Sequence, residues 1–328
     1  MLTFIAVNND IKYSVIIPVY NRPQEVEELL QSLAQQQYKH FEVLLVEDGS
    51  TNTCKEVFEK YADQLSIRYF YKANSGPGPS RNFGYQQARG EYFVVFDSDC
   101  IIPPHYFTAV ELHRQSIAFD AWGGPDRGHR DFTQLQQAMA FTMSAFLTTG
   151  GIRGGKKQVG WFQPRSFNMG ISRAVFLQTG GFKFSRYAED IEFSIRIKKS
   201  DFAIAYIPEA FVFHKRRSTL KAFYWQVYNF GRGRVQVGRV HKGSVKITHA
   251  FPSLFVAGLF LSTSLVLLSP AIGSLLVFCY LAYFIAIFIA AYKSTLSLRI
   301  ALLSIPTAVV QLVGYGMGFI REFIRGRR

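Results

Sequence analysis

The stretch Tyr92–Asp99, which reads YFVVFDSD, decides how this chain folds. Its apolar run 92–96 predicts a buried strand, because a short continuous apolar run is typical of a strand covered on both faces. The carboxylates of Asp97 and Asp99 follow at once and share one side of an extended chain, since alternate side chains of a strand point the same way. In an open α/β sheet, ligands bind beyond the carboxyl ends of the strands. The stretch therefore predicts acidic ligand-binding groups at the edge of such a sheet.

The sequence before this stretch alternates between strand and helix patterns. Strand-like runs cover Tyr13–Val19, Phe41–Val46 and Ile67–Tyr71. Helical spacing of apolar residues follows each run, which indicates strand–helix units. We expect a doubly wound, mostly parallel α/β sheet. We expect a first helix over 24–36, with Asn21 or Arg22 as its cap and Pro23 at its first position. We expect a second helix over 53–61. A third helix would begin in the Gly-Pro-rich loop 76–82 and end near Ala88.

The second half of this region is less regular, but it carries a third acidic motif. Glu189 and Asp190 open an amphipathic pattern that predicts a helix over Glu189–Lys199. The other expected elements are a helix over Phe132–Leu147, a strand over Phe167–Ile171, a helix over Arg173–Thr179, and short strands over Ala203–Tyr206 and Phe211–Phe213 that lead to His214.

The composition changes near residue 250. Phe251–Tyr292 contains no charged residue, and apolar segments cover roughly 251–269, 272–292 and 296–320. A helix needs about 20 apolar residues to span a bilayer. We therefore expect an α/β domain over 1–250 and a membrane region over 251–328, with a helical hairpin over 251–292. A third span would put the C-terminal arginines outside, against the positive-inside rule, so we expect segment 296–320 to be interfacial or re-entrant.

The chain is strongly basic, with 37 Lys and Arg against 23 Asp and Glu and a net charge of +14. Such a charge is typical of proteins that bind nucleic acids or anionic lipids. The apolar segments favour lipid, and we expect a membrane partner and no nucleic acid. The flanking cations are Lys242, Lys246, Lys293 and Arg299.

The cysteines and the N-terminus indicate in which cellular compartment the protein resides. Cys54, Cys100 and Cys279 are odd in number and lack paired spacing, which argues against a disulfide framework or a zinc site and for a reducing compartment. The short apolar patch 2–7 has no basic flank, so we do not expect a signal peptide.

The acidic motifs suggest a metal-assisted reaction on a phosphorylated substrate. Two hard carboxylate ligands at Asp97 and Asp99 suit Mg²⁺ or Mn²⁺ and leave positions open for a diphosphate. An Asp-x-Asp motif is also a common turn. The turn after the first strand, Pro18–Asn21, lacks the glycines of a dinucleotide-binding loop. Tyr20 is then free to stack on a base, and the alternative is a simple strand-end turn.

Together these residues carry a family resemblance over about Tyr13–Arg234. The chain resembles the family 2 glycosyltransferases of the GT-A fold, and within them the membrane-attached, exopolysaccharide-type branch. The motifs that carry the resemblance, in order, are 14–21 (SVIIPVYN), 46–50 (VEDGS), Arg81-Asn82-x-Gly84, Asp97-Ser98-Asp99, Phe167-Asn168-Met169, Gly180-Gly181-Phe182 and 189–192 (EDIE).

The resemblance implies a nucleotide-sugar donor site. Asp48 would hydrogen-bond the base, typically uracil, and Arg81 would reach toward the base or the phosphates. A surface cation on a helix is the alternative for Arg81. The residues that would line the nucleotide pocket are Pro18, Tyr20 and Asn21.

The resemblance also assigns the metal and the base. Asp99 would ligate Mg²⁺ or Mn²⁺, Asp97 would contact the ribose or the metal, and His214 would complete the metal shell unless it is structural. Asp190 would be the general base that deprotonates the acceptor hydroxyl, and a helix cap is its other role. Glu189 would be a supporting acid or an acceptor contact.

Acceptor contacts are predicted on two further segments. Trp161, with Phe162, follows a glycine-rich stretch and forms either an acceptor platform or core packing. Arg232 and Arg234 stand where processive synthases of the family carry Gln-x-x-Arg-Trp, which is absent here. They would bind a diphosphate, either of the leaving nucleotide or of a lipid-linked acceptor. The alternative is that both are solvated cations.

The sequence thus predicts an inverting, metal-dependent hexosyltransferase. It would move a sugar from a nucleotide-diphospho-sugar, UDP-linked by resemblance, to a hydroxyl of a lipid-linked or cell-surface glycan during polysaccharide biosynthesis. The catalytic domain would face the cytoplasm at a bacterial inner membrane. The alternatives are a polyprenyl-phosphate sugar synthase, a nucleotidyltransferase and a basic nucleic-acid-binding protein.

Overall fold

The computed structural model describes residues 11–129, 131–150 and 161–326. It contains two compact units, each described by itself below. The first consists of Met1–Arg127 and Phe162–His214, and the second of Gly128–Trp161 and Lys215–Arg328. This division differs from the boundary expected at residue 250, because the segment after His214 packs with the C-terminal helices.

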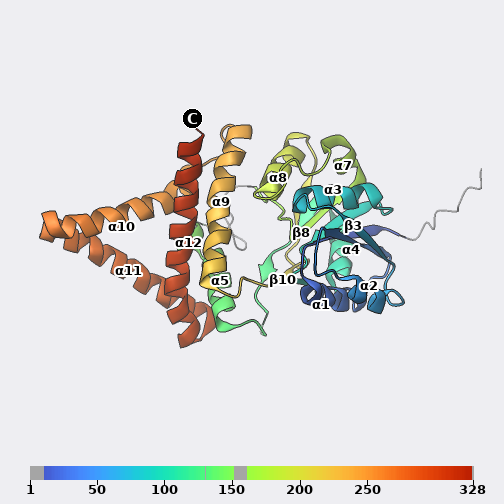
Figure 1. Cartoon of the computed structure of the whole chain (residues 1–328), viewed down its shortest axis with the longest axis horizontal. Coiled ribbons are helices and arrows are strands. Elements are labelled where there is room, and N and C mark those ends of the chain that lie inside the picture. Colours follow the sequence, from blue (N-terminus) through green and yellow to red (C-terminus); the bar gives the residue numbers. More distant parts are fainter. Residues whose placement is uncertain (1–10, 130, 151–160, 327–328) are drawn as a thin grey trace, which may run out of the picture. The chain divides into compact units, whose positions relative to one another are not determined.

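The first unit is built on a seven-stranded sheet in the order β3-β2-β1-β4-β8-β6-β9. Neighbours β3, β2, β1 and β4 are parallel, as are β6 and β9, whereas β8 is antiparallel to β4 and β6. The predicted α/β class with a mostly parallel sheet is therefore confirmed (Figure 1). The strands are β1 (Tyr13–Val19), β2 (Phe41–Asp48), β3 (Ile67–Lys72), β4 (Tyr92–Phe96), β6 (Ala121–Gly123), β8 (Asn168–Ser172) and β9 (Ile204–Tyr206).

Helices cover both faces of this sheet because its strands are apolar on both sides. In β4, Val94 and Phe96 enter one core, and Phe93 and Val95 enter the other. The first core is closed by α1 (Pro23–Ala34), α2 (Lys55–Tyr61) and α4 (Tyr106–Ser116), and the second by α3 (Pro77–Gln87), α7 (Arg173–Thr179) and α8 (Glu189–Lys199). Figure 1 shows α3, α7 and α8 on the side of the sheet opposite α1 and α2.

A second, three-stranded sheet lies next to the end of β4. Its order is β5 (Cys100–Ile101), β10 (Val212–His214) and β7 (Asp126–Arg127). The antiparallel register of β10 and β5 pairs His214 with Cys100. This pairing brings a histidine from late in the sequence beside Asp99.

Arg22 is the N-cap of α1 and Pro23 is its first residue, as predicted, but the Arg22 side chain makes no capping bond because its guanidinium binds Asp99. One local expectation was wrong. The helix expected over 132–147 is broken into α5 (Gln134–Ser144) and α6 (Phe146–Thr149), since Ala145 has extended backbone with ψ of 140°. A capping box between Thr133 and Gln136 fixes the start of α5.

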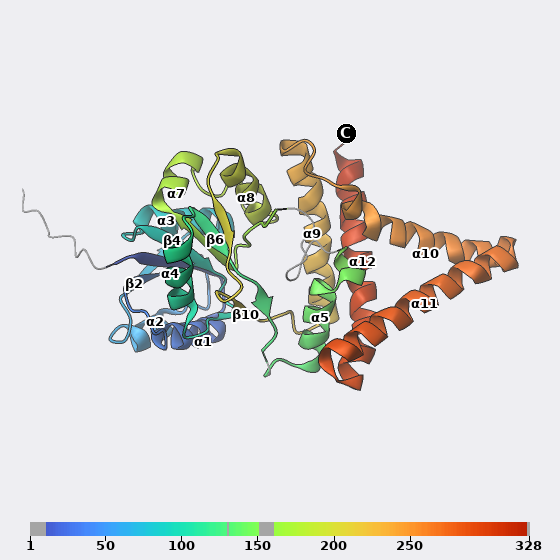
Figure 2. The ribbon, with the colours of Figure 1, turned by 180° about the vertical axis from the view of Figure 1, so that it is seen from behind.

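The second unit is dominated by long helices. Helices α10 and α11 form the predicted hairpin, and α12 packs along α9 (Figures 1 and 2). The packing is close: a Cβ on Gly318 of α12 would lie 2.0 Å from the carbonyl oxygen of Tyr228 in α9. The elements are α9 (Leu220–Val240), a 3₁₀ turn η1 (Ile247–Ala250), α10 (Phe251–Leu268), α11 (Pro270–Thr295) and α12 (Leu298–Arg325).

Three segments of this unit, 247–268, 270–295 and 298–325, are long and apolar enough to cross a membrane. They suggest association with a membrane. The third differs from the first two: 44% of its most apolar window is buried inside the protein, against 11% in each of the others. Helix α12 continues through Pro306 without a break. Its interfacial placement stays a prediction.

Candidate active site

Two of the three predicted acidic motifs lie at the carboxyl ends of strands in the first unit, and the third begins a helix. Asp48 ends β2, and Asp97-Ser98-Asp99 connects β4 to β5. Glu189 and Asp190 begin α8, which follows a left-handed residue, Ala188, with φ of 58°. Ion pairs and hydrogen bonds tie each of these carboxylates to a particular partner.

Asp99 lies between two basic side chains. Its Oδ2 is 2.6 Å from Nη1 of Arg22, and its Oδ1 is 3.1 Å from Nε2 of His214. Burial lowers the pKa of Arg22, but the Asp99 carboxylate outweighs this effect and holds that pKa above its ordinary value. The Asp99 side chain is 13% exposed, so it is partly shielded from water. The structure thus brings together Asp99 and His214, which the sequence analysis named as possible ligands of one cation.

The donor set around Asp99 suits a hard or borderline divalent cation. Ligand atoms of Asp99, Cys100 and His214 all lie within 4.8 Å of one another. Burial, followed by the nearby Asp99 and Asp97 carboxylates, raises the pKa of the Cys100 thiol well above its ordinary value. That thiol lies 3.6 Å from the carbonyl oxygen of Phe167. The Asp99 carboxylate and the His214 imidazole form a mixed oxygen and nitrogen donor pair, which fits Mn²⁺ better than a soft metal.

Arg81 joins Asp97, the first carboxylate of the Asp97–Asp99 motif, to α8. Its Nη2 donates to Asp97 Oδ1 at 2.7 Å, and its Nη1 donates to Glu189 Oε1 at 2.8 Å. The guanidinium also lies over the ring of Phe182, 5.2 Å from its centroid. Only 2% of Arg81 is exposed. Arg81 was predicted to contact the base or the phosphates of the donor. In the structure, both of its terminal nitrogens bind carboxylates.

Asp190 is the more accessible acid of the Glu189-Asp190 pair. Its side chain is 16% exposed, against 9% for Glu189. Its Oδ1 accepts a hydrogen bond from the next backbone N–H, that of Ile191, at 2.8 Å. Its Oδ2 lies 3.8 Å from Nη1 of Arg165, a residue that the sequence did not single out. Asp190 thus lies at the positive end of a helix dipole, which favours a carboxylate.

The environment of Glu189 predicts a specific pH dependence of stability. Burial raises the pKa of Glu189 to about 7, with Asp190 adding to the rise and Arg81 opposing it. Because the pKa of Glu189 is higher in the folded than in the unfolded state, protonated Glu189 stabilises the fold. This contribution to the free energy of unfolding is complete below about pH 4.5 and is lost as the pH rises through 7. The loss amounts to about 3 kcal/mol at most. We expect the melting temperature of Glu189→Gln relative to wild type to rise between pH 5 and pH 8, and a difference constant with pH would contradict this.

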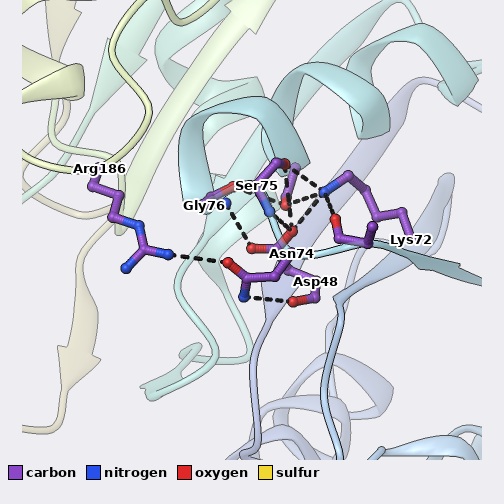
Figure 3. A network of polar contacts seen from close by, with 8 residues as sticks. Asp48, Lys72, Asn74, Ser75, Gly76 and Arg186 are labelled. Atoms are coloured by element: carbon purple, nitrogen blue, oxygen red, sulfur yellow. Dashed lines mark hydrogen bonds and ion pairs between the residues drawn. The ribbon is translucent and has the colours of Figure 1, made fainter.

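Asp48 is the centre of a polar network at the end of β2 (Figure 3). Its Oδ1 accepts from Lys72 Nζ at 2.5 Å and from the Ser75 N–H at 2.9 Å, and its Oδ2 accepts from the Gly76 N–H at 2.8 Å. Burial acts to raise the pKa of Asp48, but these hydrogen bonds outweigh it and hold the pKa below its ordinary value. Gly76 has φ of +98°, a conformation that side-chain-bearing residues rarely adopt.

The network predicts a large effect of Asp48→Asn on stability. The amide removes the negative charge that faces Lys72 and can no longer accept at both ends, so a backbone N–H loses its acceptor, while the partly exposed Lys72 keeps its hydrogen bonds to Ala73 and Ser75. We expect the unfolding free energy to fall by about 2 kcal/mol. Thermal melts of Asp48→Asn, Lys72→Met and the double variant measure the coupling between the two residues. The exposed Asp63→Asn is the matched control, and equal effects of the Asp48 and Asp63 changes would exclude the role of the network.

The segment before α8 is attached to α3 by contacts that sequence analysis missed. The Asn82 side-chain amide donates to the carbonyl of Phe182 and accepts from its N–H, both at 2.8 Å. The Gly78 N–H donates to the Ser185 carbonyl at 3.0 Å, and a Cβ on Gly78 would lie 2.1 Å from the Phe184 oxygen. The signal was present in the motifs Arg81-Asn82-x-Gly84 and Gly180-Gly181-Phe182, but their contact was not expected. This attachment fixes where α8 begins.

A further contact joins this segment to the Asp48 network. Arg186 Nη2 donates to Asn74 Oδ1 at 3.0 Å, and Asn74 Nδ2 donates to the Asp48 carbonyl at 2.7 Å (Figure 3). The predicted base-binding region and the segment that leads to Asp190 are therefore connected through side chains of the first unit.

The residues expected to line the nucleotide pocket differ in accessibility. Pro18 is partly buried near the end of β1, and Tyr20 is 53% exposed. Asn21 has φ of 54°, and its Oδ1 accepts from the N–H groups of Thr51 and Asn52, both at 2.9 Å. Tyr20 is thus available for stacking, whereas the Asn21 side chain holds the neighbouring loop.

The remaining predicted residues belong to the second unit. Trp161 is 36% exposed. Arg232 Nε lies 3.0 Å from Glu322 Oε2, and Arg239 Nη1 lies 3.0 Å from Glu322 Oε1, while Arg234 is buried. The structure thus pairs Arg232 with a carboxylate of α12. Its diphosphate-binding role, like that of Arg234, stays a prediction.

Comparisons with known proteins agree with this architecture. Residues 14–175 match the model of Glycosyl transferase family 2. The solved mannosyltransferase PcManGT of Pyrobaculum calidifontis, in complex with GDP-Man and Mn²⁺, superposes with a TM-score of 0.61 at 16% identity and covers 95% of this chain and 87% of its own. The solved residues 1–349 of Staphylococcus aureus TarS, in complex with UDP, superpose with a TM-score of 0.50 at 19% identity, covering 96% and 92%.

Sequence relatives match over a shorter range. TarS of S. aureus, a poly(ribitol-phosphate) β-N-acetylglucosaminyltransferase, is 42% identical over 92 residues, which are 27% of this chain and 16% of that protein. An uncharacterised glycosyltransferase of Rickettsia felis is 44% identical over 91 residues, which are 28% and 15%. The chain thus spans about a sixth of the length of these relatives.

The fold, with acidic residues at the carboxyl edge of a mixed, mostly parallel sheet, is the GT-A fold followed by long apolar helices. Residues 14–175, just under half of the chain, are similar to Glycosyl transferase family 2.

Proposed function

We propose that this protein is an inverting glycosyltransferase that moves one sugar from a nucleotide-diphospho-sugar to an acceptor hydroxyl. The observation that carries the proposal is the connection Asp97–Arg81–Glu189. One buried guanidinium binds both the predicted donor-side carboxylate and the residue next to the predicted base. Such a bridge suits a reaction in which the residues that bind the donor and the residue that activates the acceptor must be held at a fixed distance from each other.

The proposed step is an in-line displacement. Asp190 accepts the proton of the acceptor hydroxyl as its oxygen forms a bond to the anomeric carbon. The bond between that carbon and the diphosphate oxygen breaks, and the nucleoside diphosphate leaves with the electron pair. A divalent cation bound at Asp99, with Asp97 and His214, would supply charge stabilisation for the leaving diphosphate. Arg81 and Glu189 hold Asp97 and the start of α8 in place.

The donor we propose is UDP-linked. Asp48, Tyr20 and Pro18 would contact its nucleoside. The UDP complex of TarS supports this choice of base, and the Mn²⁺ complex of PcManGT with GDP-Man supports a manganese or magnesium cofactor. The hydrogen bonds from residues 72–76 to the Asp48 backbone and side chain would hold Asp48 in place for the base.

The acceptor we propose is a lipid-linked or cell-surface glycan. The apolar helices α10–α12 support a membrane location, and flanking cations such as Lys246 and Lys293 support a cytoplasmic face for the catalytic region. We place the protein with the membrane-attached, exopolysaccharide-type branch. The absence of Gln-x-x-Arg-Trp from the sequence supports transfer of a single sugar rather than processive polymerisation.

A donor screen tests the proposal. The full chain in detergent is melted with UDP-, GDP- and dTDP-sugars, each with and without Mn²⁺, and hydrolysis of each donor is followed in parallel. We expect a UDP-sugar to raise the melting temperature and to be hydrolysed slowly, both only with the cation. If no nucleotide-sugar changes either readout, the donor site is wrongly assigned.

A further inference from the structure

Arg22 occupies an unexpected position for a residue of the first strand–helix turn. Its Nη1 lies 2.6 Å from Asp99 Oδ2, the carboxylate that would ligate the divalent cation. A guanidinium is a permanent cation at any physiological pH. The carboxylate predicted to bind a metal thus already carries a positive partner supplied by the chain itself.

The backbone around Arg22 is held firmly, whereas its side chain is accessible. Asn21 adopts φ of 54° and is anchored through its N–H to Ser50 Oγ at 2.8 Å and through its Oδ1 to Thr51 and Asn52. The Arg22 side chain is 30% exposed, but that of Arg81 is only 3% exposed. Arg22 can therefore leave its carboxylate for solvent or a ligand, while Arg81 cannot do so without removing an ionic partner from the buried Glu189.

We propose that Arg22 competes with the divalent cation for Asp99 and transfers to the donor's diphosphate when cation and donor bind together. This inference rests on the proposed function. A guanidinium and a divalent cation on one carboxylate repel each other strongly at such short range. Phosphate oxygens offer the displaced guanidinium a bidentate partner. Arg22 thereby weakens binding of the cation alone and makes cation binding depend on the donor. The cation and the donor therefore bind cooperatively.

Manganese binding without turnover tests this role. The full chain in detergent is titrated with Mn²⁺ while the EPR signal of the free ion is followed, with and without UDP. We expect Arg22→Gln to bind Mn²⁺ alone about tenfold more tightly than wild type. We also expect UDP to increase the Mn²⁺ affinity of wild type at least several-fold more than that of Arg22→Gln. Arg165→Gln, which removes a positive charge beside Asp190 instead, is the matched control and should change Mn²⁺ affinity less than twofold.

The outcomes separate this inference from the proposed function. If Asp99→Asn abolishes Mn²⁺ binding but Arg22→Gln behaves as Arg165→Gln does, the metal site stands and the role of Arg22 is wrong. If Arg22→Gln and Arg165→Gln tighten binding equally, the effect is general electrostatics and the inference is also overturned. If no variant binds Mn²⁺ at millimolar concentration, the metal site and the role of Arg22 both fail.

Discussion

Asp190→Asn is expected to lower the rate of sugar transfer by about 10²–10⁴-fold, the usual contribution of a positioned general base. The amide has nearly the size of the carboxylate and can still accept from the Ile191 N–H. It cannot take a proton from the acceptor hydroxyl. Donor binding should therefore stay near normal, and transfer alone should be lost.

The measurement is single-turnover transfer to a lipid-linked acceptor together with UDP-sugar binding by calorimetry. Asp201→Asn, at an exposed position beyond the other end of α8, is the control and should be active. Loss of donor binding in Asp190→Asn would mean that Asp190 belongs to the donor site. Nearly full transfer would favour a polyprenyl-phosphate acceptor, because a phosphate needs no strong base.

Asp99→Asn is expected to lower Mn²⁺-dependent donor binding and transfer by about 10²–10³-fold, which corresponds to several kcal/mol of lost charge stabilisation. The variant keeps the side-chain shape but removes the charge that faces Arg22 and His214. The remaining activity should depend only weakly on the concentration of cation.

Donor binding as a function of Mn²⁺ concentration is the measurement for this variant. The exposed Asp63→Asn serves as the control for a general change in net charge. An Asp99→Asn protein that binds donor with the same Mn²⁺ dependence as wild type would show that the cation binds elsewhere.

Much of the fold was predictable because local patterns and burial agree in it. The runs 13–19, 41–46 and 92–96 are apolar on both faces, so only a sheet covered by helices satisfies them. Short strand–helix spacing then dictates parallel neighbours. The uncharged region after residue 250 likewise predicted long apolar helices, since runs of about 20 apolar residues are typical of them.

The pairing of the side chains was less predictable. Arg81 was expected to reach a ligand, but burial between α3 and α8 commits it to Asp97 and Glu189. Arg22 is the predicted N-cap of α1, but the contact of its guanidinium with Asp99 was not expected. Arg165 was not considered, and Asn82 was noted only as part of a motif. Each of these contacts joins residues far apart in the sequence, where spacing carries no information.

The order of the acidic motifs and the apolar strands before them established by themselves that carboxylates would gather at the carboxyl edge of an α/β sheet, because strand direction is a local property of the chain. Which arginine neutralises which carboxylate was decided only by the tertiary structure. An ion pair depends on where two distant backbones are brought together: the turn before α1 brings Arg22 to Asp99, and the contact of α3 with the segment before α8 brings Arg81 to Glu189.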